Sequence, residues 1–105
     1  MRRKKTPIKS PASAVMPALV MRLYVVNNAP NSLLAIANLA AICKEFLHDN
    51  FKLEIVDVLA EPLRALADGI LVTPSLAKLS PSPAANIVGN LSDKSGVMRA
   101  LGIRG

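Results

Sequence analysis

The sequence predicts an α/β domain whose strands and helices follow one another in the order βαβαββα. Two apolar runs with a strand-like period of two, residues 18–26 and 51–58, lie on either side of a long run with a helical period. A strand, a helix and a second strand in this order form a right-handed crossover. Prolines and glycines divide the rest of the chain into shorter elements. With 105 residues, the chain has room for one domain and one core.

The first strand and the turn after it are predicted from residues 18–30. Residues 18–26 (ALVMRLYVV) are apolar on both alternating faces, as in a strand that is buried on both sides of a sheet. Asn27 and Asn28 follow, and both tolerate turn conformations and can cap a helix. Pro30 suits the first turn of a helix. We therefore expect a strand, a tight turn and the start of a helix here.

The helix predicted over residues 31–48 carries a wider apolar arc than one contact with a sheet requires. Exposed apolar patches of this kind usually mark interfaces. Leu34 and its neighbours are therefore expected either to face a partner or second subunit, or to lie in a groove of their own domain. Cys43, inside this run, is expected to be a small buried hydrophobe.

The middle of the chain predicts a second strand and a short helix. Residues 51–58 (FKLEIVDV) alternate at first and then turn apolar, which is typical of a strand. Pro62 opens a short helix that has Leu63 and Leu66 on one side. Gly69 lies just past the end of this helix, where glycine is common.

The second half of the chain ends with two strands and a helix. A third strand is expected over residues 70–79 (ILVTPSLAKL), although Pro74 lies inside it and a central strand tolerates proline poorly. After a proline-rich loop, residues 86–90 (NIVGN) predict a short strand. The Ser92-Asp93 pair caps a last helix that ends at Gly102.

Basic residues are concentrated at the start of the chain. The net charge is +6, and five of the 13 basic residues are Arg2, Arg3, Lys4, Lys5 and Lys9. From residue 10 onward the charges nearly balance, so no basic folded face is expected. We expect residues 1–17 to form a disordered basic arm, either solvated or attracted to an acidic partner, ahead of a domain over residues 18–105. We expect neither nucleic acid nor a membrane as a partner.

Residues for catalysis or for binding a metal or cofactor are not grouped in a local motif. His48 has no paired nucleophile beside it, and Asp57, Glu61 and Asp68 lack the spacing of metal ligands. A glycine-rich phosphate loop is missing as well. We therefore expect no enzyme activity, no cofactor and no metal site. One cysteine and no secretory signal fit a reducing compartment, so we expect a cytoplasmic protein.

Two segments resemble the thioredoxin family. GILVTPSLAKL (residues 69–79) resembles the family's segment around its cis proline, and VGNLSDK (residues 88–94) resembles the segment before its last helix. The resemblance implies a cis bond before Pro74. It also puts Asn28 and Asn31 where the family has two redox cysteines. Because disulfide exchange needs thiols, we expect this scaffold to bind rather than to catalyse.

The span from Leu19 to Leu101 resembles the KaiB family of clock proteins from cyanobacteria and their bacterial homologues. The matching words, in register, are LYV, PNS, IVDVL, ILVTPSLAKL, PSP and IVGNLS. The resemblance implies a non-enzymatic regulatory protein that binds a KaiC-like hexameric ATPase and modulates clock or stress signalling. It also implies a histidine kinase as a candidate competitor, and a resting homo-oligomer that is a dimer or a tetramer.

KaiB proteins adopt two folds, so the resemblance implies a ground-state order βαββααβ beside the thioredoxin-like order βαβαββα. Residues 75–92 mix helix formers with β-branched residues and show no dominant period, which fits both orders. X-Pro bonds isomerise slowly, over tens to hundreds of seconds. The candidates for the conformational switch are therefore Pro74, Pro81 and Pro83.

The candidate partner-binding residues under this resemblance are Leu34, Glu54, Arg64 and Lys78. Leu34, Glu54 and Gly69 stand where KaiB proteins carry basic residues, whereas Lys78 keeps the family's lysine. Such changes at a polar rim alter the choice of partner more than the fold. The alternative function is a degenerate thioredoxin-like redox protein or chaperone that uses Cys43. A nucleic-acid binder that uses the basic arm is a more distant alternative.

Overall fold

The computed structural model describes residues 19–48 and 50–103. The elements are β1 (Leu19–Val25), α1 (Pro30–Ile42), η2 (Cys43–Leu47), β2 (Phe51–Asp57), α2 (Pro62–Ala67), β3 (Ser75–Ser80), β4 (Ala85–Val88) and α3 (Lys94–Leu101). Because η2 is a π-helical turn that continues α1, the predicted order βαβαββα is confirmed. The alternative order βαββααβ is not the one seen in this structure. The arm predicted over residues 1–17 lies outside the described residues.

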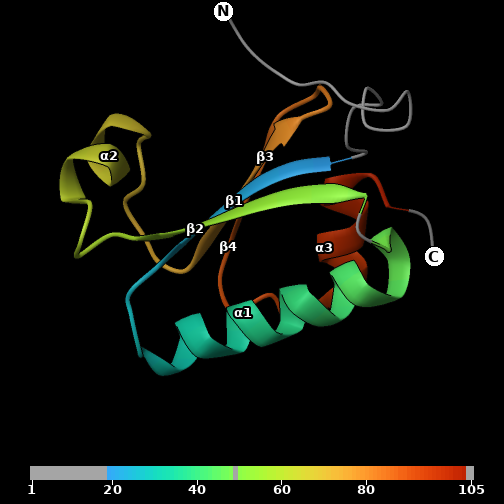
Figure 1. Cartoon of the computed structure of the whole chain (residues 1–105), viewed down its shortest axis with the longest axis horizontal. Helices are drawn as coiled ribbons and strands as arrows, with labels where there is room; N and C mark the ends of the chain where they lie inside the picture. The colour runs from blue at the N-terminus through green and yellow to red at the C-terminus, as the bar shows by residue number, and fades with distance from the viewer. Residues whose placement is uncertain (1–18, 49, 104–105) are drawn as a thin grey trace, which may run out of the picture.

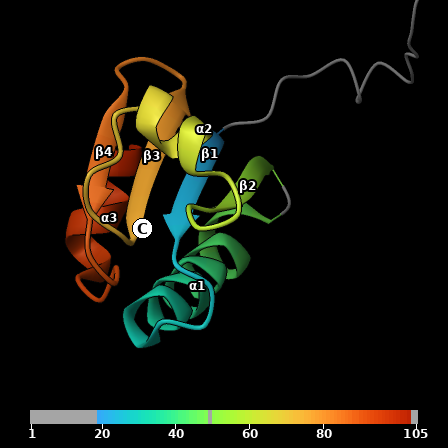
Figure 2. The same ribbon diagram turned by 90° about the vertical axis from the view of Figure 1, so that its left-hand side faces the viewer.

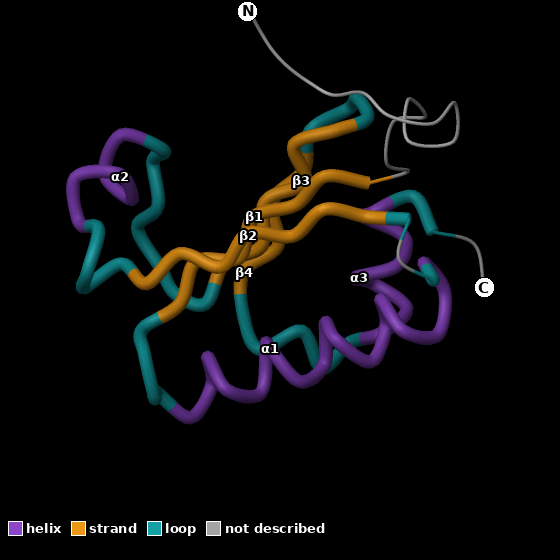
Figure 3. Tube along the Cα trace, viewed as in Figure 1, coloured by secondary structure: helices purple, strands orange, loops and turns teal. Residues whose placement is uncertain are grey.

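The described strands form one mixed sheet in the order β2-β1-β3-β4. Strand β1 is parallel to β2 and antiparallel to β3, and β4 is antiparallel to β3. Helices α1 and α3 lie on one side of the sheet, and α2 lies on the other side (Figures 1 and 2). Figure 3 shows how the chain leaves β2, forms α2 beyond the end of that strand and returns to β3.

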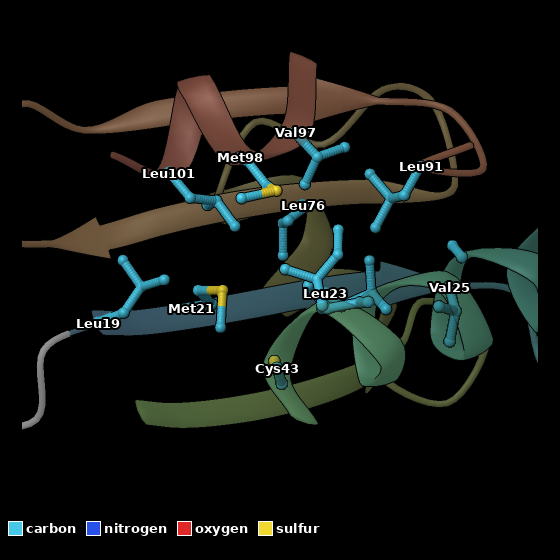
Figure 4. Packing of buried hydrophobic residues seen from close by; sticks show 13 residues of the cluster. Leu19, Met21, Leu23, Val25, Cys43, Leu76, Leu91, Val97, Met98 and Leu101 are labelled. Atoms are coloured by element: carbon cyan, nitrogen blue, oxygen red, sulfur yellow. The ribbon is translucent and has the colours of Figure 1, made fainter. Parts of the chain in front are cut away.

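The main core lies between the sheet and the helices α1 and α3 (Figure 4). Alternate side chains of β1 enter it, namely Leu19, Met21, Leu23 and Val25. Helix α3 contributes Val97, Met98 and Leu101 from the opposite side. The core is largely aliphatic, in keeping with a sequence in which only 3% of the residues are aromatic. A second, smaller cluster on the α2 side consists of Tyr24, Val56 and Ala77.

Helix α1 begins without a side-chain cap, so the prediction that Asn27 or Asn28 caps it is wrong. Ala29 is the N-cap residue, and Asn28 instead takes a left-handed turn conformation with a φ of 66°. Ser32, in the first turn of α1, ties the helix to the end of β1, because its buried hydroxyl accepts a hydrogen bond of 3.0 Å from the Val26 N–H. The residues of α1 that are buried are Ser32, Ala35, Leu39 and Ile42.

The third strand begins later than predicted. The prediction placed it over residues 70–79, whereas β3 covers Ser75–Ser80. Pro74 has no N–H to donate to a neighbouring strand, so regular pairing starts after it and the preceding residues stay outside the sheet. The bonds before Pro74, Pro81 and Pro83 are all cis, and the first of them agrees with the thioredoxin resemblance.

The last helix is bounded as predicted. The Asp93 carboxylate accepts a hydrogen bond of 3.2 Å from the Gly96 N–H at the start of α3. Gly102 ends the helix in a left-handed conformation with a φ of 76°, which glycine adopts at little cost.

Candidate functional site

Helix α2 turns its apolar side away from the sheet. Ala65 is the buried residue of this helix, whereas Leu63 and Leu66 are 80% and 69% exposed. The flanking loops add further exposed apolar side chains. We call this set the α2 patch, and its members are Leu59, Leu63, Leu66, Leu71 and Val72. Exposed apolar side chains gathered in one short segment are typical of an interaction surface.

The geometry of a helix separates the two sides of α2. Successive residues are rotated by about 100° around the axis. Glu61, Arg64 and Ala65 therefore lie on one side of the segment, and Leu63 and Leu66 lie on the other. The side of α2 with the charged residues faces the sheet, because the residues that bind these charges lie on β1 and β2.

The first of these partners is Glu54 on β2. Its Oε1 atom accepts hydrogen bonds from Arg64 Nη2 at 2.5 Å and from Arg22 Nε at 3.0 Å. Arg22 and Glu54 are direct neighbours in the parallel register of β1 and β2. The hydrogen bond from Arg64, followed by that from Arg22, lowers the pKa of Glu54 to about 2. The same bond to Glu54 raises the pKa of Arg64.

The second contact involves Asp68, at the C-terminal end of α2. The Tyr24 hydroxyl donates a hydrogen bond to Asp68 Oδ2, and Arg22 Nη1 donates to the same oxygen at 3.3 Å. Tyr24 is buried, and this burial together with the bond to Asp68 raises its pKa. Arg22 also donates to Tyr24 Oη at 3.3 Å, which raises the pKa of Arg22. Two polar contacts therefore attach α2 to the sheet.

Two of the predicted partner-binding residues, Glu54 and Arg64, lie together and bind each other. Leu34 lies elsewhere, on the outer side of α1, where it is 49% exposed beside Leu33 at 51%. The wide apolar arc predicted for this helix is therefore present, and the described part of the chain does not cover it. The partner-binding roles of Leu34, Glu54 and Arg64 stay predictions.

Lys78, the fourth predicted partner-binding residue, is buried on β3 with 6% of its surface exposed. Its register partner is Met21, whose side chain lies in the main core. The Lys78 ammonium group lies close to Gly102, at the C-terminal end of α3: a side chain at Gly102 would place its Cβ atom 3.8 Å from Lys78 Nζ. The dipole of a helix favours a cation there. This position indicates a structural role and does not support the predicted contact with a partner.

Cys43, on which the redox alternative depends, lies in the main core (Figure 4). It is 4% exposed, and burial raises the pKa of its thiol, which disfavours the reactive thiolate. Over residues 19–48 and 50–103, no three His, Cys, Asp or Glu side chains are grouped so that they could hold a metal ion. Within the same ranges, no helix has the length and apolar character that a membrane crossing needs.

The leucines of the α2 patch cannot be assigned to the surface from the sequence alone. A helical period puts Leu63 and Leu66 on one side of the helix, but it does not say whether that side meets the sheet. The available signal is the high density of leucine in a short segment that is interrupted by Pro62 and Gly69. Such a segment is too short to bury much apolar surface against a core.

The sequence of the chain matches a known family over most of its length. The family model described as the KaiB domain matches residues 22–103. The chain belongs to the KaiB family. Among its relatives, the circadian clock protein KaiB3 of Synechocystis sp. is 43% identical over 88 residues, which cover 84% of this chain and 86% of the relative. The circadian clock oscillator protein KaiB of Prochlorococcus marinus is 42% identical over 82 residues, or 78% of this chain and 69% of the relative. The resemblance to KaiB is thus confirmed.

Solved structures place this KaiB-family protein among thioredoxin-like folds. The N-terminal domain of SasA from Synechococcus elongatus superposes with a TM-score of 0.67 at 20% identity, over 95% of this chain and 93% of that domain. Mitochondrial thioredoxin 3 of Saccharomyces cerevisiae superposes with a TM-score of 0.66 at 9% identity, over 81% of this chain and 77% of that protein. At such low identity the likeness concerns the fold, which is the predicted one.

Proposed function

We propose that this KaiB-family protein is a non-enzymatic regulator that docks on a KaiC-like hexameric ATPase through the α2 patch. The observation that carries the proposal is the orientation of α2, whose Leu63 and Leu66 point away from the sheet to which the helix is attached. The class of partner is supported by the relatives, which are named circadian clock proteins.

The α2 patch has the composition that a protein partner requires. Leu59 and Leu71 are 71% and 88% exposed, so covering them removes apolar surface from water. Asp57, Glu61 and Asp68 alternate with these leucines along the chain, and Glu61 and Asp68 are paired with Arg64 and Arg22. An apolar centre with a polar rim is the usual anatomy of an interface.

The outer side of α1 is the second candidate surface. Leu33 and Leu34 are half exposed there, next to the small side chain of Ala37. We assign this surface to self-association in a resting dimer or tetramer, which leaves the α2 patch for the ATPase. The two surfaces belong to different helices on opposite sides of the sheet (Figure 2).

Fold switching belongs to the proposal as well. A partner shifts an equilibrium between two folds only if it binds one of them more tightly. The α2 patch is described in the thioredoxin-like order, and an ATPase that binds the patch more tightly in that order shifts the chain away from βαββααβ. Pro74, Pro81 and Pro83 stay the candidates for the switch, and a histidine kinase stays the candidate competitor for the same ATPase.

The test is binding of the full chain to the KaiC-like ATPase of its own organism, with and without ATP, by size exclusion and by titration. We expect a complex, and we expect Leu63→Asp with Leu66→Asp to weaken it at least about tenfold, since buried interface anchors dominate affinity. Val88→Asp is the matched control, because Val88 is 60% exposed on β4, outside the patch. Leu34→Asp tests the α1 surface and should change self-association instead.

Two results would count against the proposal: one would contradict the function, and the other would contradict the docking surface. No complex between the wild-type chain and the ATPase over several hours would remove the function. A complex that the Leu63→Asp, Leu66→Asp variant forms with unchanged affinity would keep the function and remove the α2 patch as its surface.

A further inference from the structure

One oxygen atom joins three elements of the structure at the base of α2. Glu54 Oε1 accepts hydrogen bonds from Arg22 on β1 and from Arg64 on α2, and Glu54 itself belongs to β2. Arg64 is also within 3.4 Å of Glu61, which precedes the helix. Glu54 thereby holds the Arg64 guanidinium against the sheet, and Glu61 binds the same guanidinium from within the α2 segment.

The apolar attachment of α2 is small by comparison. Ala65 is the buried residue of the helix, and an alanine brings one methyl group out of water. Val58 and Ile70, in the loops before and after the helix, are only partly buried against the cluster of Tyr24, Val56 and Ala77. Hydrophobic stabilisation grows with the apolar area that is buried. The charged contacts therefore supply a large share of what holds α2 in place.

We infer that Glu54 is a positioning residue for the docking surface: by fixing Arg64 against the sheet, it sets the rotation of α2 that points Leu63 and Leu66 outward. Glu54 itself is turned toward Arg22 and Arg64 and does not belong to the α2 patch. Its effect on a partner is thus indirect. The statement that Glu54 positions α2 can be tested without a partner. Only the statement that this positioning serves binding to the ATPase rests on the proposed function.

This attachment responds to salt. Ion pairs at a surface are screened by dissolved ions, whereas apolar packing is not weakened in this way. The attachment of α2 is therefore expected to loosen as ionic strength rises, while α1, which packs on the sheet through Leu39 and Ile42, stays in place. Presentation of the α2 patch would then depend on ionic strength even before any partner binds.

The experiment measures amide hydrogen exchange in the full chain for the wild type, Glu54→Gln, Arg64→Gln and the double variant. The amides of residues 65–70 report on α2, and those of α1 serve as the internal reference. We expect each single substitution to speed exchange in α2 by about two- to fivefold, the upper part of the range for exposed ion pairs. The double variant should exchange about as fast as either single one, because the two residues act as a unit.

Two further readouts separate a positioning role from a general loss of stability. Raising sodium chloride from about 0.05 to 0.5 M should speed α2 exchange in the wild type, and speed it less in Glu54→Gln, which among the described residues keeps only the Arg22–Asp68 pair between α2 and the sheet. Affinity for the KaiC-like ATPase should fall about three- to tenfold in Glu54→Gln. The matched control is Glu45→Gln, which breaks the 2.9 Å ion pair with Lys94 on the other side of the sheet. It should leave α2 exchange and affinity unchanged.

The outcomes are distinguishable. If α2 exchange and its salt dependence are the same in Glu54→Gln as in the wild type, the positioning role is wrong. If exchange rises but affinity for the ATPase does not fall, Glu54 holds the helix without serving the docking surface, and the inference is again overturned. If the wild type binds no ATPase, the proposed function fails, and the exchange data still decide whether Glu54 positions α2.

Discussion

Helices α1 and α2 are attached to opposite sides of the same sheet by different kinds of contact. The inner side of α1 is apolar, and Leu39 is fully buried there. The inner side of α2 holds Arg64 and Ala65, and its leucines face outward. The long helix is fixed by the core, whereas the short helix is fixed mainly by ion pairs and one tyrosine hydroxyl.

The difference teaches that an apolar stripe on a helix does not always mark its buried side. A helix of 13 residues such as α1 has enough apolar surface to cover the sheet and still expose Leu33 and Leu34. A helix of six residues such as α2 has one apolar side only. Because Glu54 on β2 attracts Arg64, and Arg22 and Tyr24 on β1 bind Asp68, the charged side of α2 faces the sheet and the leucine side remains free for a partner.

Shortening Leu39 should have the largest effect on stability. Leu39→Ala removes a fully buried side chain of α1 and leaves a cavity, so we expect the free energy of unfolding to fall by about 2–5 kcal/mol. Urea denaturation measures this change. The control Leu34→Ala, on the outer side of α1, should change it by less than about 0.5 kcal/mol. Equal losses in both variants would mean that α1 is packed differently.

A charge at the buried position of α2 should have the next largest effect, but a local one. Ala65→Asp places a carboxylate in the contact with the sheet and next to Glu61 and Asp68, so α2 should detach at a cost of about 1–3 kcal/mol. Amide exchange should therefore rise in α2 and stay unchanged in α1. Ala65→Ser, of similar size and without charge, is the matched control. Equal exchange in α1 and α2 would contradict the separate attachment of the two helices.

Acid should loosen α2 before α1. The pKa of Glu54 is about 2, compared with an ordinary value of 4.5, so its stabilising contribution is complete above pH 4.5 and is lost as pH falls toward 2. The cations that face it, Arg22 from β1 and Arg64 from α2, stay charged throughout. We expect α2 exchange, corrected for intrinsic rates, to rise over this interval more than α1 exchange does.

Glu54→Gln is the control for the acid experiment. Glu61 and Asp68 also lie near α2 and are present in both proteins, so a difference between the two pH profiles isolates Glu54. The variant should show a smaller rise in α2 exchange between pH 4.5 and 2. Identical profiles would assign the acid response to the other carboxylates.

Removing an outward leucine should have the smallest effect on folding. Leu63 is 80% exposed, so Leu63→Ser should change the free energy of unfolding by less than about 0.5 kcal/mol while it weakens partner binding. Denaturant titration measures the first quantity. A loss above about 1 kcal/mol would mean that Leu63 packs against the sheet in solution, and the contrast between α1 and α2 would no longer hold.

Much of the scaffold follows from local sequence patterns. A run that is apolar on both faces predicts β1, alternation predicts β2, and Asp93 and Gly102 predict the ends of α3, because these signals act over a few residues. The start of β3 does not follow, since residues 70–72 read as a strand although pairing begins only after Pro74. Whether an apolar residue joins a ladder depends on a neighbouring strand that the local pattern does not contain.

For the candidate site, the sequence by itself determined that α2 has one leucine-rich side and that Glu54 and Arg64 are candidate residues for binding a partner. Only the tertiary structure decided which side of α2 meets the sheet and that these two charges bind each other. The physical reason is distance along the chain. Arg22 and Asp68 contact one another across 46 residues, and only the folded sheet brings such groups within 3.3 Å.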